Sequence, residues 1–282
     1  TFNIARNWNR LKKSTWGRDF QTARIGFVSA PSNINVIGKP LNGILAYRTD
    51  GVYQNDNEVP FCYINGRKRP LGVGSLFYRA GDRIILDYDG NGRIGTSLPL
   101  EEDRVYCGSP LPIAQGGIVS TWYWKGFDLN LLFNYVIGRH ILNAGKGASL
   151  GTYMSAFEKE LTKPVFADLS KVSFWQKPGD RADYPANRLE DGLMNFSTYL
   201  SSNIEKVSYL KLKTLTLGYT LPVKWKEKLG FGARIFISAE NLFTITNYSG
   251  PDPESVDIIT GVDNLTNYPL ATRVTFGLTL KL

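Results

Sequence analysis

Residues 208–248 read SYLKLKTLTLGYTLPVKWKEKLGFGARIFISAENLFTITNY, and this stretch decides the fold. It contains two runs in which apolar and polar residues alternate, joined by a turn around Pro222 and a basic segment that ends at Gly230. The same alternation returns in residues 272–282. Strands of roughly ten residues with one apolar and one polar face are typical of transmembrane β-barrels. The pattern therefore predicts strands that cross a membrane.

Composition alone leaves two all-β architectures open. The chain has 282 residues, is 43% hydrophobic and contains 15 Tyr, 15 Phe and 6 Trp. Such aromatic residues form girdles at the membrane interfaces of barrels, but they also fill the core of a β-sandwich, which composition by itself slightly favours. A mean hydropathy of −0.20 does not decide between them, because a barrel places its lipid-facing residues at alternate positions. No run of about 18 apolar residues is present, which excludes a helical membrane span.

The charge of the chain is basic but dispersed. The formal net charge is +8, and the densest clusters are Lys12–Lys13, Arg67–Arg69 and Lys224–Lys228. Nucleic-acid-binding proteins concentrate their basic residues on one face, so we expect no nucleic-acid partner. A pore lining or the anionic lipopolysaccharide of an outer membrane accounts for the charge equally well.

The clearest hairpin joins residues 117–125 to residues 127–138 through a turn at Lys125–Gly126. Its second arm alternates strictly, with Phe127, Leu129, Leu131, Phe133, Tyr135 and Ile137 on one face. In residues 208–221 the apolar phase slips, which either a β-bulge or a strand that crosses from the lumen rim into the lipid belt would produce. Further strands are expected at 43–53 and as a pair formed by 1–12 and 22–29.

Two long connections, residues 55–115 and 140–205, contrast with these tight turns. Short turns at one end and long loops at the other are the asymmetry of outer-membrane barrels, whereas sandwiches rarely carry two loops of this length. The asymmetry therefore decides for the barrel. A connection as long as the first should be functional or packed as a substructure of its own.

One segment of the first connection has the pattern of a calcium loop. Asp87, Asp89 and Asn91 occupy positions 1, 3 and 5, followed by a glycine and Arg93, as in the first half of an EF-hand loop. The bidentate Glu at position 12 is replaced by Leu98. A turn held by its own side-chain hydrogen bonds is the alternative to a calcium site.

The remaining candidates are aromatic residues and thiols. Tyr53, Trp175 and Tyr184 could contact substrate by stacking on sugar rings, or they could pack the loops in which they occur. The two cysteines, Cys62 and Cys107, fit either an extracytoplasmic disulfide or two unpaired thiols. A single histidine and the absence of nucleophile or dinucleotide motifs argue against an enzyme.

Several segments, in order along nearly the whole chain, resemble one family. They are GKPLNGILAYRTDGVYQ (38–54), GDR (81–83), DYDGNGRI (87–94), WKGFDLNLLFNY (124–135), YLKLKTLTLGYTLP (209–222), RIFISAENLFTITNYSGPDPE (234–254) and YPLATRVTFGLTLK (268–281). Together they resemble the C-terminal part of the SusC/RagA-type TonB-dependent outer-membrane receptors of Bacteroidetes.

The resemblance implies an all-β fold, the C-terminal portion of a 22-stranded antiparallel transmembrane barrel with long extracellular loops. The whole of residues 1–282 would be this portion, with the plug, the TonB box and the early strands absent. It further implies a location in the Gram-negative outer membrane, a SusD-like surface lipoprotein as lid, energy from TonB–ExbB–ExbD, and import of oligosaccharide or peptide. A secreted β-rich glycan-binding module or adhesin is the alternative function.

Overall fold

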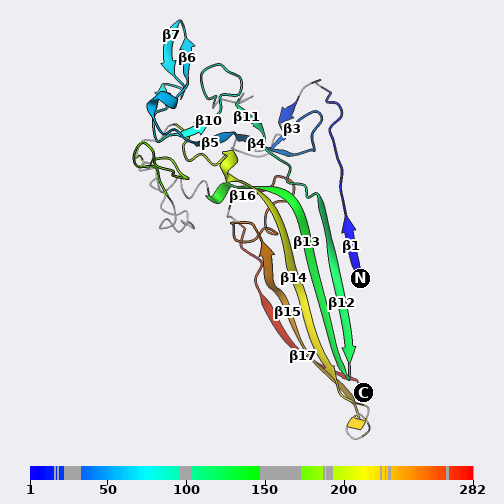
Figure 1. Ribbon diagram of the computed structural model, residues 1–282. Helices are drawn as coiled ribbons and strands as arrows, with labels where there is room; N and C mark the ends of the chain where they lie inside the picture. The colour runs from blue at the N-terminus through cyan, green and yellow to red at the C-terminus, as the bar shows by residue number, and fades with distance from the viewer. Residues whose placement is uncertain are drawn as a thin grey trace.

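The protein consists of a tall sheet of antiparallel strands with a smaller body above it (Figure 1). This computed structural model describes the following residues: 1–15, 17, 19–21, 33–95, 103–146, 173–186, 188, 193–222, 224–225, 227, 230–264 and 267–281. The predicted strand at 22–29 and Leu98 lie outside these residues. No helix in the described part of the chain has both the length and the apolar character needed to cross a membrane.

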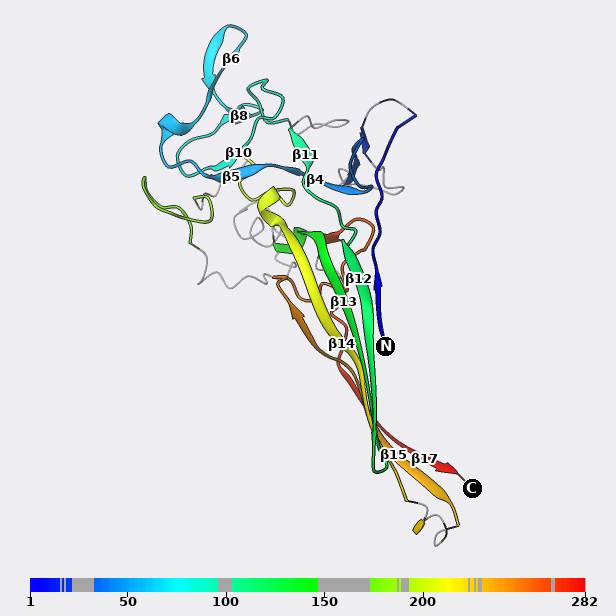
Figure 2. The same cartoon turned by 45° about the vertical axis from the view of Figure 1, so that its right-hand side comes forward.

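The sheet, which we call the wall, is antiparallel along its whole strand order of β1-β12-β13-β14-β15-β17. Its strands are β1 (Phe2–Ala5), β12 (Ala114–Trp124), β13 (Phe127–Asn143), β14 (Ile204–Thr220), β15 (Gly232–Thr246) and β17 (Arg273–Lys281). A short strand, β16 (Val262–Asp263), adds to the upper end of β13 in parallel. β1 and β17 form the two edges of the wall, which Figure 2 shows from another side.

The register of the wall separates polar from apolar side chains in complete rows. One row across five strands is apolar and consists of Trp122, Leu129, Leu217, Ile237 and Phe276. The next row is polar and consists of Thr121, Asn130, Thr216, Ser238 and Thr275. Because side chains alternate across a strand, the two rows lie on opposite faces of the wall. The alternation predicted from the sequence is therefore confirmed over five neighbouring strands.

The tight turn between β12 and β13 has the expected position. Lys125 and Gly126 both have positive φ, 47° and 90°, which is the type I′ geometry that matches the twist of a two-residue hairpin. Trp122, Trp124, Phe127 and Tyr219 surround this end of the wall on its apolar face. The turn thus carries an aromatic cluster beside a basic residue.

The predicted phase slip in β14 is a β-bulge. Leu132 pairs with Thr214 and Phe133 with Leu212, so Lys213 is the extra residue. A second bulge follows on the other side of the same strand, where residues 241–242 of β15 lie opposite Lys213. These bulges let Lys211 and Lys213 both reach the polar face.

The sequence predicts that residues 1–12 pair with residues 22–29. This prediction is wrong, because the strand in the first segment, β1, has a different partner. β1 pairs with β12 instead, with Phe2 opposite Ile118. The ring of Phe2 stacks on Tyr135 at 5.8 Å between centroids, and the Tyr135 hydroxyl donates to the Asn3 carbonyl at 2.8 Å. Gly116 leaves room for this arrangement, because a Cβ there would lie 2.1 Å from the Asn3 carbonyl oxygen.

The body above the wall, which we call the upper body, is built from short strands. They are β2 (Phe20–Gln21), β3 (Asn33–Asn35), β4 (Gly43–Tyr47), β5 (Thr49–Val52), β6 (Phe61–Ile64), β7 (Arg67–Pro70), β8 (Gly72–Val73), β9 (Leu76–Phe77), β10 (Arg83–Ile85) and β11 (Arg104–Tyr106), with 3-10 turns at Asp56–Glu58 and Ser201–Asn203. The predicted strand 43–53 appears as β4 and β5, which pair with β11 and β10 respectively.

A salt bridge spans three strands on the polar face of the wall. The Arg234 guanidinium of β15 donates two hydrogen bonds to the Asp128 carboxylate of β13, at 3.0 and 2.5 Å. The intervening strand contributes Gly218, whose missing side chain leaves the path open. Paired hydrogen bonds between Arg and a carboxylate are among the stronger polar contacts in proteins.

A second ionic cluster ties the connection between β15 and β17 to the same face. The Lys211 ammonium is 2% exposed and contacts Asp252 at 2.8 Å and Glu254 at 3.0 Å. Lys213 also contacts Glu254, at 3.0 Å. The Asp252 carboxylate accepts further hydrogen bonds from the Leu270 and Glu254 backbone N–H groups. The segment that follows β15 is therefore folded against the polar face rather than extended away from it.

Adding a methyl group at Gly218 should break the three-strand salt bridge. A Cβ there would lie 2.4 Å from Arg234 and 2.5 Å from Asp128, so Gly218→Ala should cost about 1–3 kcal/mol through overpacking and the lost pair. Gly117→Ala on the same face is the control, since its nearest neighbour would be 3.3 Å away. Urea unfolding of the full-length protein measures both, and equal losses would contradict the role given to Gly218.

Neutralising a buried carboxylate should cost more than neutralising an exposed one. Asp252→Asn removes charge from the Lys211 cluster and should lower the unfolding free energy by about 2 kcal/mol. Glu240→Gln removes an exposed pair with Arg273, separated by 3.9 Å, and should cost at most about 0.5 kcal/mol. The two variants are compared in the same urea titration, and a larger loss for Glu240→Gln would refute this ordering.

Candidate functional site

The two long connections do not form separate loops but share one hydrophobic core. Residues from the first connection pack with Leu193 and Leu200 from the second. The buried set is Tyr47, Tyr53, Val59, Leu71, Val73, Tyr78, Ile85, Ile94, Leu193 and Leu200. The first connection is thus packed, as one of the two expectations for it required, but it shares its core with the second connection instead of forming a substructure of its own.

Polar contacts fasten the second connection to the first. Asp82 is buried, and its carboxylate accepts hydrogen bonds from the Arg188 guanidinium and from the Asn195 amide. Asn195 in turn accepts the Arg83 backbone N–H at 2.7 Å. Burial raises the pKa of Asp82 above its ordinary value, although the hydrogen bonds and the Arg188 charge oppose this shift.

The aromatic residues predicted to contact substrate have mainly a packing role. Tyr53 is 3% exposed and Trp175 is 8% exposed. The Trp175 indole donates to Gln54 at 3.2 Å, and burial raises the pKa of Tyr53 to about 12. Tyr184 is half-buried and lies 6.0 Å from Phe174. Tyr53 and Trp175 therefore follow the second of the two alternatives, packing within the loops, Tyr53 in the core of the upper body and Trp175 against Val52 and Ala186.

Residues 87–94, which we call the Asp87 loop, form the turn that their sequence indicates. The Asp87 carboxylate accepts the backbone N–H groups of Gly90 and Gly92, both at 2.8 Å. Asp89 accepts the Asn91 N–H at 3.0 Å, and the Asn91 side chain accepts the Arg93 N–H at 2.8 Å. The hydrogen-bonded turn, which was the alternative to calcium, is thus present in full.

A third carboxylate, which the sequence pattern missed, joins this loop. Asp103 accepts the backbone N–H groups of Tyr88 at 2.8 Å and Gly95 at 2.6 Å. Oxygen atoms of Asp87, Asp89 and Asp103 lie within 4.8 Å of one another. Burial is the main cause that raises the pKa of Asp87, and the neighbouring Asp89 and Asp103 carboxyls add to it. Three converging carboxylates suit a hard cation, whereas the Arg93 side chain offers only donors.

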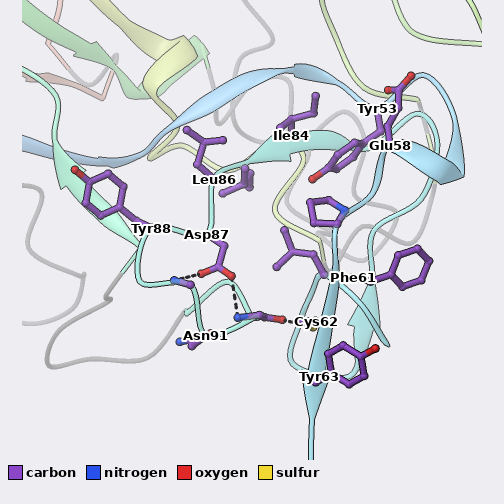
Figure 3. Close-up of a pocket in the computed structure, with 15 residues that line it drawn as sticks. Tyr53, Glu58, Phe61, Cys62, Tyr63, Ile84, Leu86, Asp87, Tyr88 and Asn91 are labelled. Carbon is purple, nitrogen blue, oxygen red and sulfur yellow. Dashed lines mark hydrogen bonds between the residues drawn. The ribbon is translucent and has the colours of Figure 1, made fainter. Parts of the chain in front are cut away.

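A cavity of about 730 Å³ lies between the Asp87 loop and strand β6 (Figure 3). Asp87 is central in this view, with Phe61 and Tyr63 on one side and Tyr88 on the other. The lining residues are Tyr53, Glu58, Pro60, Phe61, Cys62, Tyr63, Leu71, Ile84, Ile85, Leu86, Asp87, Tyr88, Gly90, Asn91 and Gly92. A size of a few hundred Å³ with aromatic walls is typical of sites that bind part of a ligand.

Of the two alternatives for Cys62 and Cys107, a disulfide or two unpaired thiols, the structure has the second, with both cysteines free. Their thiols point to different carbonyl oxygens, Cys62 to Gly92 at 3.1 Å and Cys107 to Ala46 at 3.8 Å. Burial raises the pKa of the Cys107 thiol. Cys62 is the one thiol in the cavity lining, and its hydrogen-bond partners are carbonyl oxygens rather than a base that could activate it.

Comparison with known proteins places these features in a family. TonB-dependent receptor P3 of Formosa agariphila is 30% identical to this chain over 264 residues, which cover 90% of the chain and 23% of the relative. TonB-dependent receptor SusC of Bacteroides thetaiotaomicron is 25% identical over 295 residues, covering 100% of the chain and 24% of the relative. No protein-family model matches the chain.

A solved structure shares the fold. The RagAB peptide transporter superposes with a TM-score of 0.63 and 22% identity, over 100% of this chain and 27% of that one. The chain thus spans about a quarter of the length of the relatives that it matches. Sequence and fold together match this chain to part of a SusC/RagA-type TonB-dependent receptor.

Proposed function

We propose that the protein containing this chain is an outer-membrane importer of nutrients that is driven by TonB. The observation that carries this proposal is the wall, whose alternate rows are apolar and polar across five strands. Such a wall needs lipid against one face and a polar interior against the other. The relatives named above are TonB-dependent receptors, which supports the same conclusion.

The apolar face would meet the hydrocarbon, and the aromatic cluster at the tight turn would lie at the interface. The polar face, with the Asp128–Arg234 pair and the Lys211 cluster, would line the interior of a closed barrel. Both edges of the wall, β1 and β17, would pair with strands outside this chain. Lipid and lipopolysaccharide would surround the wall, while the upper body would face the cell exterior.

The cargo is an oligosaccharide or a peptide, and a SusD-like surface lipoprotein acts as the lid. The solved structure with a similar fold is a peptide transporter, which supports the peptide alternative. TonB–ExbB–ExbD would act through a part of the receptor other than this chain. The thiol and carboxylates of the upper body make structural hydrogen bonds, so we assign this chain no covalent chemistry.

Uptake measurements test the transport proposal. Deleting the receptor gene should reduce uptake of labelled peptides or labelled oligosaccharides to the passive background, and a protonophore should do the same in the wild type. The class of substrate that loses uptake identifies the cargo. Unchanged uptake of both classes would contradict import by this receptor.

The secreted glycan-binding module is separated from the importer by a physical measurement. The full-length importer should require detergent for extraction and should change its gel mobility on heating, as closed barrels do. A protein that partitions into the aqueous phase without detergent and shows one mobility would instead be the secreted module.

We also propose that the Asp87 loop binds calcium, because Asp103 adds a third carboxylate to Asp87 and Asp89. A cation would offset the mutual repulsion that contributes to the raised pKa of Asp87. The loop lacks a bidentate Glu at position 12, so the affinity should resemble that of extracellular sites, with a dissociation constant of about 0.1–1 mM.

Calcium should raise the unfolding temperature of the full-length receptor, and Asp89→Asn should abolish that increase. Asp50→Asn, which removes an exposed carboxylate elsewhere in the upper body, should leave the calcium effect intact. Thermal unfolding with calcium, magnesium or chelator measures the difference. If calcium has no effect on the wild type, the loop is a hydrogen-bonded turn only.

A further inference from the structure

The apolar face of the wall has a definite upper limit, on the side of the upper body. In β13 the last residue of this face is Ile137, which is 45% exposed. At about 3.4 Å per residue and a strand tilt of about 40°, β13 rises by about 26 Å from Phe127 to Ile137. This height matches the apolar band of about 25 Å that transmembrane barrels present to lipid. The level of Ile137 therefore marks the outer boundary of the hydrocarbon.

The strands beside β13 change from apolar to polar residues at the same level. Leu210 of β14 and Ile245 of β15 lie in one row on this face. Two residues further toward the upper body come Ser208 in β14 and Asn247 just after β15. Because side chains alternate along a strand, Ser208 continues the face of Leu210. The boundary is thus shared by neighbouring strands.

The edge strand β1 brings a basic segment to this boundary. Ile4 is 61% exposed and lies opposite Gly116 of β12. Arg6 follows two residues later, at the level of Ala114, which pairs with Ile137. The chain then continues past the upper end of β12 toward the upper body (Figures 1 and 2). We call residues 6–13 the collar.

The collar exposes cations and an indole ring. Its sequence, RNWNRLKK, contains no acidic residue. The side chains of Arg6, Arg10, Lys12 and Lys13 are exposed, and Trp8 is 80% exposed. None of the salt bridges among the described residues includes a cation of the collar. Its positive charge is therefore available to a ligand from outside the chain.

Hydrogen bonds hold the collar against a neighbouring turn. The Leu11 N–H donates to the Lys39 carbonyl at 3.0 Å. The Asn9 side chain accepts the Leu41 N–H at 2.8 Å. A surface that is ordered in advance loses less entropy when it binds a ligand.

The two arginines of the collar are positioned by their neighbours. The Arg6 guanidinium lies 4.0 Å from the centre of the Trp8 ring, and a Cβ on Gly38 would lie 3.5 Å from Nη2 of Arg10. A guanidinium stacked on a ring keeps its N–H groups in its own plane and can still donate a pair of hydrogen bonds. Phosphate oxygens accept such pairs. Trp side chains are enriched where hydrocarbon meets headgroups.

We propose that the collar binds the phosphate groups of lipopolysaccharide in the outer leaflet, with Arg6 and Arg10 donating to phosphate oxygens and Trp8 anchoring the collar at the hydrocarbon boundary. This inference rests on the proposed outer-membrane location. Lipopolysaccharide places acyl chains and phosphates at successive depths, and the wall offers its apolar face and then the collar in the same order. Basic residues next to a membrane surface are attracted to anionic headgroups.

An acidic protein surface suits this position less well. Phe2 and Ile4 lie directly below the collar and are both exposed, and the Phe2 ring stacks on Tyr135 of the apolar face. A ligand here must therefore cover hydrocarbon-facing side chains and cations together. A phosphorylated lipid contains both complementary parts in one molecule.

The test measures how much lipid A, the phosphorylated anchor of lipopolysaccharide, the full-length receptor binds in detergent. Native mass spectrometry counts the bound molecules of phosphorylated and of dephosphorylated lipid A. One variant removes the charges, Arg6→Gln with Arg10→Gln, and a second removes the ring, Trp8→Ala. The matched control is Arg67→Gln with Arg69→Gln, two exposed arginines of the β6–β7 hairpin, which projects above the upper body (Figure 1). Heat-modifiable gel mobility shows whether each variant remains folded.

The wild type should bind phosphorylated lipid A about tenfold or more tightly than the dephosphorylated form, because charged hydrogen bonds to phosphate are strong. The arginine variant should lose this preference, and the control should keep it. Near 0.5 M salt the preference of the wild type should shrink, since the screening length falls to about 4 Å. Trp8→Ala should weaken the binding of both forms alike.

Four results would overturn the proposal. A wild type without preference for the phosphorylated form, or an arginine variant that keeps the preference, would remove the phosphate site and leave the import proposal intact. An equal loss in the control would assign the binding to diffuse charge. An arginine variant that keeps lipid A binding but loses a protein that co-purifies with the wild type would assign the collar to a protein partner. A receptor that is absent from the outer-membrane fraction would overturn the importer itself.

Discussion

The constraint on which the rest of the structure depends is the hydrogen-bonded ladder of the wall. Each interior strand must satisfy its backbone groups through two neighbours while it keeps polar and apolar side chains on opposite faces. The register that achieves this also determines which positions require glycine, because a side chain there would clash with a neighbouring strand. Gly218 makes room for the Asp128–Arg234 pair, and Gly116 makes room for the Tyr135 ring. The bulge at Lys213 then turns an extra cation toward the polar face, where acidic residues of the next connection meet it.

The upper body is held by a different principle. Its strands are short, and its stability comes from a core and a polar network to which both long connections contribute. Asp82, Arg188 and Asn195 join residues more than a hundred positions apart in the sequence. The wall holds the ends of both connections at fixed positions. This reduces the conformational entropy that these long loops lose when they fold. The upper body can therefore present fixed features, such as the cavity, above the strands.

Local pattern was sufficient for some parts of the fold and insufficient for others. The alternation in residues 127–138 and 272–282, the turn at Lys125–Gly126 and the slip in β14 are properties of neighbouring residues, and all could be predicted. The partner of β1 could not, because β12 lies more than a hundred residues away. Asp103 follows Asp87 by 16 residues and falls outside the EF-hand spacing, so only the folded loop brings the two carboxylates together. Tyr53 and Trp175 look accessible in a loop, and only tertiary packing between segments far apart in the sequence buries them.

The contact between Cys62 and Gly92 gives the molecule a built-in chemical reporter. The Cβ of Cys62 sits so close to Gly92 that even a methyl group on that glycine would lie 2.3 Å from it. Cys62 is half-buried and lines the cavity beside the Asp87 loop, so a reagent that adds to its sulfur would lie against that loop. The alkylation rate at Cys62 consequently reports on the packing between β6 and the Asp87 loop. Cys107, held against the Ala46 carbonyl in another part of the upper body, provides an internal reference in the same experiment.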